Sequence, residues 1–139
     1  MKYLIDSQKK AEITQKTVRL LKRHCKAMAA VYVFGSFVTD KLFSDIDIGI
    51  LLVESDRKTL NAELELESQL EKIIKYPVDV RILNTAPLSF VRHVIKNGRL
   101  IVDIDPTFRS DFESLTARKY FDFSRFRKRY LEDVCNAPI

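Results

Sequence analysis

Three aspartates stand where carboxylates could do chemistry together. Asp45 and Asp47 are two positions apart in an alternating apolar run, so both carboxylates point to one face of a strand, roughly 7 Å apart along the backbone. Asp79 interrupts a second apolar run, on the face opposite Val78 and Val80. Burying such anions is costly unless their pKa values rise or a cation compensates them. Carboxylate oxygens suit Mg²⁺, with Mn²⁺ as a second candidate.

A Gly-Ser pair precedes these aspartates. Gly35 and Ser36 end a short apolar run, nine residues before Asp45. Glycine permits a tight turn or a close approach of a phosphate to backbone N–H groups, and serine adds a hydroxyl donor. Alternatively, the pair is an ordinary strand-to-helix turn, and the aspartates face solvent or pair with Lys or Arg. Taken together, the two features predict a phosphate cradle beside paired carboxylates on a neighbouring strand.

Short strands and amphipathic helices must position these residues. Because the strands are few and short and alternate irregularly with helices, we expect an α+β fold with a small mixed β-sheet and helices packed on it. No repeat or linker interrupts the 139 residues, so we expect a single domain over 1–139. Apolar periodicity predicts helices over 8–28, 57–75, 88–96 and beyond Pro106, and strands over 31–34, 45–53, 78–83 and 99–103.

Composition excludes several classes of protein. With 46% hydrophobic and 31% charged residues, three glycines and four prolines, the chain is neither disordered nor fibrous. Its longest uncharged stretch, 27–39, is shorter than the roughly 20 residues of a membrane helix. Cys25 and Cys135 suggest no disulfide framework, and no secretory signal is visible at the start. We expect a cytoplasmic protein without a membrane segment.

The net charge of +5 is unevenly distributed. The first 28 residues carry +6 and residues 118–130 carry +5, which leaves about −6 for the rest of the chain. Basic ends could serve nucleotide phosphates, nucleic acid or an acidic protein partner, or could simply be solvated. In the basic C-terminal segment, Phe123, Phe126 and Tyr130 recur at helical spacing and predict a buried stripe with the bases facing outward. Stacking on single-stranded nucleic acid is the alternative.

These residues carry a resemblance to a known family. The run 33–48, VFGSFVTDKLFSDIDI, resembles the Gly-Ser…Asp-x-Asp signature of the DNA polymerase β-like nucleotidyltransferase superfamily. The run 76–88, YPVDVRILNTAPL, is similar to the third-carboxylate strand and following turn of the minimal nucleotidyltransferases, the MntA-type antitoxins that accompany HEPN-domain toxins. Residues 94–102 and the helix from Arg118 fit the C-terminal half less specifically. The resemblance therefore spans nearly the whole chain.

The resemblance implies the polymerase β-like palm fold and a role for each candidate residue. Gly35 and Ser36 would hold the β- and γ-phosphates of ATP. Asp45, Asp47 and Asp79 would be the metal ligands and catalytic carboxylates, with Mg²⁺ bridging the phosphates. Asp79 could also accept the proton of the attacking hydroxyl.

In the family, AMP is transferred from ATP to a tyrosine of the partner HEPN RNase toxin, which is thereby neutralised. We accordingly expect a hetero-complex with a HEPN toxin and no direct nucleic-acid binding. Lys41 and Arg81 are candidates for further phosphate contacts.

One feature departs from the family. Eight residues, 37–44, separate Ser36 from Asp45, where ten are common, and Asp40 stands near the usual glycine. The shortening motivates a second hypothesis, a catalytically decayed antitoxin that acts by binding its toxin. Transfer to a small-molecule hydroxyl, such as that of an aminoglycoside, is a third. A polymerase is not expected, because the chain has no room for template-handling domains.

Overall fold

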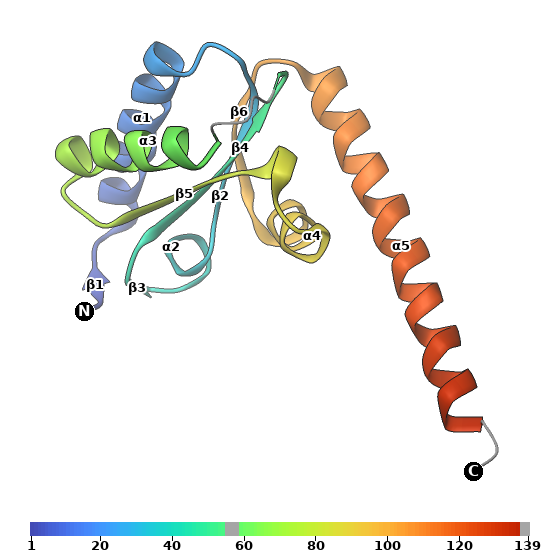
Figure 1. The fold of residues 1–139 in the computed structure, drawn as a ribbon. Coiled ribbons are helices and arrows are strands. Elements are labelled where there is room, and N and C mark those ends of the chain that lie inside the picture. Colours follow the sequence, from blue (N-terminus) through green and yellow to red (C-terminus); the bar gives the residue numbers. More distant parts are fainter. Residues whose placement is uncertain (55–58, 137–139) are drawn as a thin grey trace.

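A four-stranded mixed sheet lies at the centre of the computed structural model, which describes residues 1–54 and 59–136 (Figure 1). The strand order is β5-β4-β2-β6. β2 (Met28–Phe34) pairs antiparallel with β4 (Ile46–Leu52) and with β6 (Arg99–Asp103), whereas β4 and β5 (Val78–Ile82) are parallel. A parallel pair needs a crossover, which α3 (Thr59–Ile74) supplies. The expected α+β fold is confirmed.

Helices cover both faces of this sheet. α1 (Ser7–His24) and α3 lie on one face, and α4 (Leu88–Asn97) and α5 (Pro106–Asn136) lie on the other (Figure 1). Alternation along β4 sends Ile46, Ile48 and Ile50 toward α1 and α3, where they join the larger apolar core. The opposite face carries Asp47. Its smaller core is formed by Ala29, Ala30, Tyr32, Phe34, Leu51, Leu83 and Val94.

Several predicted boundaries were wrong by a few residues. β2 begins at Met28, because the Met-Ala-Ala run pairs within the sheet and is buried, and α1 consequently ends at His24. A second, two-stranded sheet of β1 (Tyr3–Leu4) and β3 (Leu42–Phe43) was not predicted. The strand predicted to reach residue 83 ends at Ile82 and continues as a short 3-10 helix, Leu83–Thr85. The predicted start of a helix at residue 57 lies outside the described residues.

The edge strand β5 is satisfied by glutamates from α3. The N–H groups of Val78 and Val80 donate to Glu71 Oε1 at 3.0 Å and Glu67 Oε1 at 2.8 Å. Four residues of helix advance about 6 Å and two residues of strand about 6.6 Å. Glutamates four positions apart on α3 can therefore reach N–H groups two positions apart on β5. Paired in this way, the edge is closed to another strand, and the strand that carries Asp79 is held in place.

α5 packs on the sheet with its first half only. The Tyr32 hydroxyl donates to Glu113, and Arg109 pairs with Asp103 at 2.8 Å and with Glu113 at 3.2 Å. The second half extends beyond the rest of the molecule (Figure 1). The predicted buried stripe was wrong in this respect: Phe123, Phe126 and Tyr130 are 56%, 69% and 59% exposed, because no described element covers them. No helix in 1–54 or 59–136 is long and apolar enough to cross a membrane.

Candidate active site

Sheet pairing brings two of the predicted carboxylates together. Asp47 on β4 stands directly opposite Asp79 on the parallel strand β5, and opposite Phe34 on β2. Side chains of paired residues point to the same face of a sheet, so both carboxylates emerge on the side of α4. Asp45 precedes β4 by one residue and accepts a hydrogen bond from the Ser44 hydroxyl at 3.3 Å.

Gly35 directly follows β2 and lies beside Asp47. Its φ of +77° lies in the region that favours glycine. A Cβ built on Gly35 would overlap the Asp47 carboxylate, with the Asp47 Cγ only 3.2 Å away. Glycine is therefore required here both by its backbone conformation and by the lack of space for a side chain. The turn lies in close contact with Asp47, one of the predicted metal ligands.

The electrostatics of the site show an acidic cluster that Arg81 compensates only in part. The pKa of Asp47 is raised from 3.8 to about 6 by desolvation first and then by the charges of Asp45 and Asp79, with Arg81 opposing the rise. Arg81 reaches Asp79 with a 3.7 Å N–O distance, and both side chains are half exposed. The carboxylates of Asp45, Asp47 and Asp79 are hard oxygen donors of the kind that Mg²⁺ or Mn²⁺ prefers. The residues fit a divalent cation in chemistry. In the described part of the chain, however, no group of three His, Cys, Asp or Glu side chains is placed so that it could hold a metal ion.

Ser36 opens the short helix α2 (Ser36–Thr39), directly after the glycine turn. The Gly35 carbonyl accepts hydrogen bonds from the N–H groups of Val38 at 3.1 Å and Thr39 at 3.2 Å, which closes the turn. The first N–H groups of a helix have no partner within it, so those at this end of α2 are donors available to a phosphate. The Ser36 hydroxyl lies at the same place.

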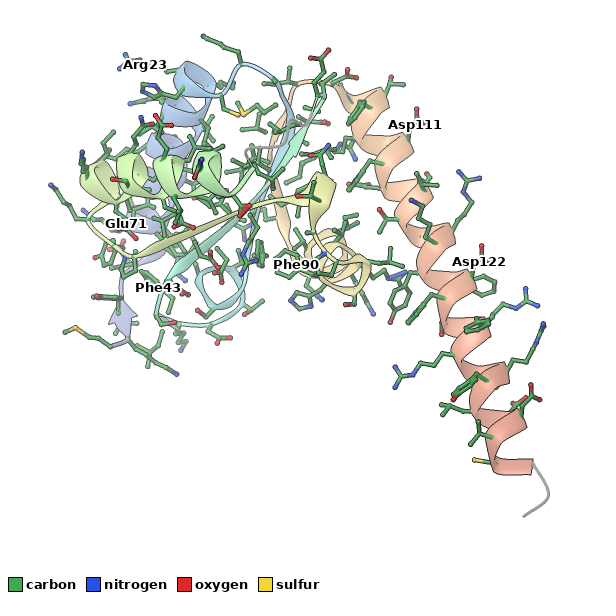
Figure 2. The ribbon with its side chains drawn as sticks, viewed as in Figure 1. Arg23, Phe43, Glu71, Phe90, Asp111 and Asp122 are labelled. Carbon is green, nitrogen blue, oxygen red and sulfur yellow. The ribbon has the colours of Figure 1, made fainter. Side chains whose placement is uncertain are left out.

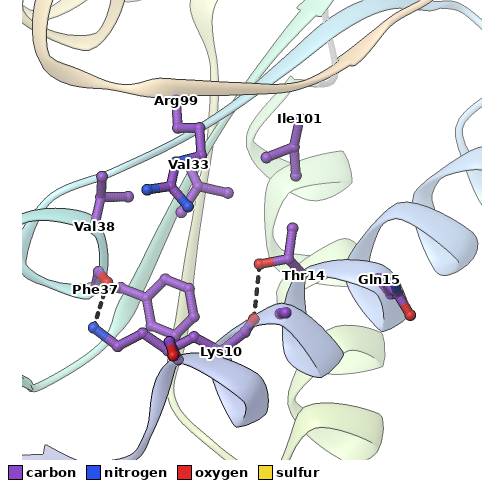
Figure 3. A pocket seen from close by; sticks show the side chains of 10 residues that line it. Lys10, Thr14, Gln15, Val33, Phe37, Val38, Arg99 and Ile101 are labelled. Atoms are coloured by element: carbon purple, nitrogen blue, oxygen red, sulfur yellow. Dashed lines mark hydrogen bonds between the residues drawn. The ribbon is translucent and has the colours of Figure 1, made fainter.

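Lys10 of α1 secures α2 from behind, a role that was not predicted. Its Nζ donates to the carbonyls of Phe37 at 2.8 Å and Asp40 at 3.0 Å, and Figure 3 shows the first of these bonds at the wall of a 380 Å³ pocket. The same ammonium lies 5.2 Å from the centre of the Phe37 ring. The available signal was its place in the helix, because Lys10 begins the buried face that continues at Ile13 and Thr17.

The short connection between Ser36 and Asp45 consists largely of two regular elements. α2 occupies its first half, and β3 occupies its second half, where Phe43 pairs with Tyr3. Asp40 has φ −115° and ψ 159°, extended backbone that any residue adopts, so this connection does not need the usual glycine. Lys41 is exposed, and no ion pair joins it to the three aspartates in the described ranges. The structure thus assembles Gly35, Ser36 and the carboxylates, and leaves Lys41 apart.

Comparison with solved structures shows the same fold in toxin–antitoxin complexes. One solved structure is that of the tri-AMPylated Shewanella oneidensis HEPN toxin in complex with MNT antitoxin. A chain of this complex superposes with a TM-score of 0.73 at 23% identity, covering 91% of this chain and 98% of that one. A toxin–antitoxin structure with AMP-PNP gives 0.74 at 23% identity, covering 88% and 98%. An MntA-HepT toxin–antitoxin structure gives 0.72 at 22% identity, covering 90% and 98%. No curated protein sequence matches significantly.

A family model covers the part of the chain that carries the site. The model for polymerase beta nucleotidyltransferases matches residues 15–107, which include Gly35, Ser36 and all three aspartates. Two thirds of the chain therefore fit this family in sequence, and the whole mixed sheet falls within the match. The chain belongs to the polymerase beta nucleotidyltransferase family.

Proposed function

We propose that this protein is an antitoxin that transfers AMP from ATP to a tyrosine hydroxyl of a partner HEPN RNase toxin. The observation that carries the proposal is the Asp47 carboxyl, which lies against the glycine turn and opposite Asp79, with its pKa raised to about 6. A cluster of this kind is unfavourable until a cation compensates its charge, and that cation can in turn bind a phosphate chain. The neighbours whose printed descriptions name an AMPylated HEPN toxin and AMP-PNP support the same chemistry.

Each side chain has a distinct part in the proposed reaction. The backbone of Gly35 and the hydroxyl of Ser36 bind the terminal phosphates and fix the direction in which pyrophosphate departs. Asp45, Asp47 and Asp79 would hold Mg²⁺, which when bound neutralises charge on the phosphates and on the leaving group. Asp79 takes the proton of the acceptor hydroxyl as its oxygen attacks the α-phosphorus. The products are an O-adenylylated acceptor and pyrophosphate.

Arg81 has two proposed roles, and both depend on its pairing with Asp79. It contacts Asp79 and lies 5.9 Å from the centre of the Phe90 ring, which holds the guanidinium beside the cluster. In that position it lowers the pKa of Asp47 and offers a cation to an incoming phosphate. We keep Arg81 as a phosphate-contact candidate, and Lys41 becomes one only if the connection moves when ATP binds.

The test is a transfer assay with the full chain. The chain is incubated with ATP, Mg²⁺ and a cognate HEPN-domain protein, and the partner is examined by intact-mass spectrometry and peptide mapping. We expect one or more adenylate additions on a tyrosine, reduced at least about 100-fold by Asp47→Asn. The matched control is Asp111→Asn, which removes an exposed aspartate on α5 (Figure 2). An unmodified partner, or an Asp47→Asn protein as active as wild type, would overturn the proposal.

A binding antitoxin without transfer is the second candidate. It is favoured by the observation that no three His, Cys, Asp or Glu side chains among the described residues are placed to hold a metal ion. The two candidates separate in cells that express the toxin. If transfer matters, Asp47→Asn fails to restore growth, whereas a binding antitoxin carrying Asp47→Asn restores growth as well as wild type does.

A further inference from the structure

The second half of α5 has no cover within the described chain. Tyr120 is its last residue that is not exposed, and the Arg92 guanidinium of α4 lies 4.5 Å from the centre of the Tyr120 ring. Every residue from Phe121 to Cys135 is exposed. This segment, here called the arm (residues 121–135), rises about 22 Å as a helix. An isolated helix of this length is only marginally stable in water, so a partner that packs on the arm would stabilise its helical conformation.

One face of the arm is apolar. Phe123, Phe126, Tyr130 and Val134 follow one another at spacings of three and four residues, and all four are more than half exposed. Tyr130 comes 18 residues, or five turns, after Phe112, which packs on the sheet. The side of the helix that holds α5 to the sheet therefore continues beyond it, uncovered, into solvent.

Two arginines lie beside the Phe126 edge of this apolar face, and the Arg125 guanidinium is also 5.6 Å from the centre of the Phe121 ring. Arg125 and Arg129 lie one turn apart and line a 290 Å³ hollow with Asp122 and Phe126. Residues 118–130 carry a net charge of +5. A second copy of the arm would bring these bases against one another, which disfavours self-association. The apolar face ends beside Glu132 and Asp133, where a nucleic-acid backbone would be repelled.

We infer that the arm binds a protein partner, and that the partner's docking surface is apolar and bordered by carboxylates. The chemistry required is a groove or helix pair that accepts the aromatic rings and pairs acids with Arg125 and Arg129. The identity of that partner as the HEPN toxin rests on the proposed function, whereas the chemistry of the surface rests on α5 alone. The arm would then bind the acceptor protein while the carboxylate site modifies it.

The experiment measures affinity and transfer separately, using full-length variants. The docking variant is Phe126→Ser/Tyr130→Ser, and Arg125→Glu/Arg129→Glu tests the charge. The matched control is Phe121→Ser: Phe121 is 60% exposed against 59% for Tyr130, and nine residues place the two on opposite sides of the helix. Affinity for the cognate HEPN-domain protein is measured by biolayer interferometry, and AMP-PNP binding by calorimetry checks that the catalytic face is intact.

We expect both double variants to bind the HEPN-domain protein at least about 30-fold more weakly, Phe121→Ser to change affinity less than about threefold, and AMP-PNP binding to be unchanged in all of them. Equal affinity in the docking variant, or an equal loss in Phe121→Ser, would overturn the inference. So would a dimeric wild type that the docking variant makes monomeric while partner affinity persists, or tight single-stranded RNA binding without partner binding. Arm-dependent partner binding without any AMP transfer would refute the proposed reaction and leave the docking surface standing.

Discussion

Asp47→Asn should make the protein more stable while removing its activity. The Asp47 carboxyl is desolvated and faces the charges of Asp45 and Asp79, which raise its pKa from 3.8 to about 6. The folded state therefore binds the proton more tightly than the unfolded state does. The penalty is absent below about pH 3.8 and develops as the pH rises to about 6, where the folded carboxyl finally ionises.

The magnitude follows from the same shift. A rise from 3.8 to about 6 corresponds to about 3 kcal/mol of destabilisation above pH 6. Because the carboxylate is only partly buried, solvent screening reduces this to about 1–2 kcal/mol. Replacing the charge with an amide should recover that amount at pH 7.5, or about 3–8 °C in Tm for a chain of this size.

Thermal unfolding followed by circular dichroism tests this directly, in metal-free buffer at pH 7.5 and pH 4.5. We expect Asp47→Asn to exceed wild type in Tm at pH 7.5 and the difference to shrink at pH 4.5, while Asp111→Asn follows wild type at both. Mg²⁺ should raise the Tm of wild type and leave that of Asp47→Asn unchanged, since only the former binds it in the folded state. A lower Tm for Asp47→Asn than for wild type, or a rise in Tm that is independent of pH, would show that ionised Asp47 does not destabilise the fold.

Three further perturbations follow from the contacts. Gly35→Ala should lower the free energy of unfolding in urea by about 1–3 kcal/mol and weaken AMP-PNP binding at least tenfold. The reason is that alanine is strained at this positive φ and its Cβ would displace the Asp47 carboxylate. Unchanged AMP-PNP affinity in calorimetry would contradict this. Lys10→Met should cost about 1–3 kcal/mol in urea unfolding through its two lost carbonyl partners, against little for exposed Lys9→Met. Glu67→Leu should cost about 1–2 kcal/mol by leaving a strand N–H without its partner, and Glu67→Gln should recover most of it if the side-chain oxygen is what matters.

Local pattern predicted those parts of the site that lie on regular strands. The alternation of 45–53 placed Asp47 on the face opposite the isoleucines, and that of 78–83 placed Asp79 likewise. Their juxtaposition needed the parallel register of β4 and β5, which no local signal encodes. The pressure of the Gly35 turn on Asp47 is equally a tertiary fact, since glycine in the sequence indicated only freedom of the backbone.

Errors arose where a segment's environment overrode its pattern. The Met-Ala-Ala run at 28–30 is typical of a helix, yet it is buried in the middle of the sheet. The aromatic spacing from Phe123 to Tyr130 was identified, but spacing alone cannot say whether anything covers the face that it defines. Lys10 was missed because a lysine at a helix start reads as exposed, whereas its carbonyl partners come from 27 and 30 residues away.

The central claim is that the three aspartates and the glycine turn bind a magnesium–nucleotide complex. Calorimetric titration of AMP-PNP into the full chain, in Mg²⁺ and then in EDTA, tests it most directly. We expect wild type to bind at least tenfold more tightly in Mg²⁺, and Asp47→Asn in Mg²⁺ to bind no better than wild type in EDTA. Equal wild-type affinities in Mg²⁺ and EDTA, or Asp47→Asn binding like wild type in Mg²⁺, would contradict it.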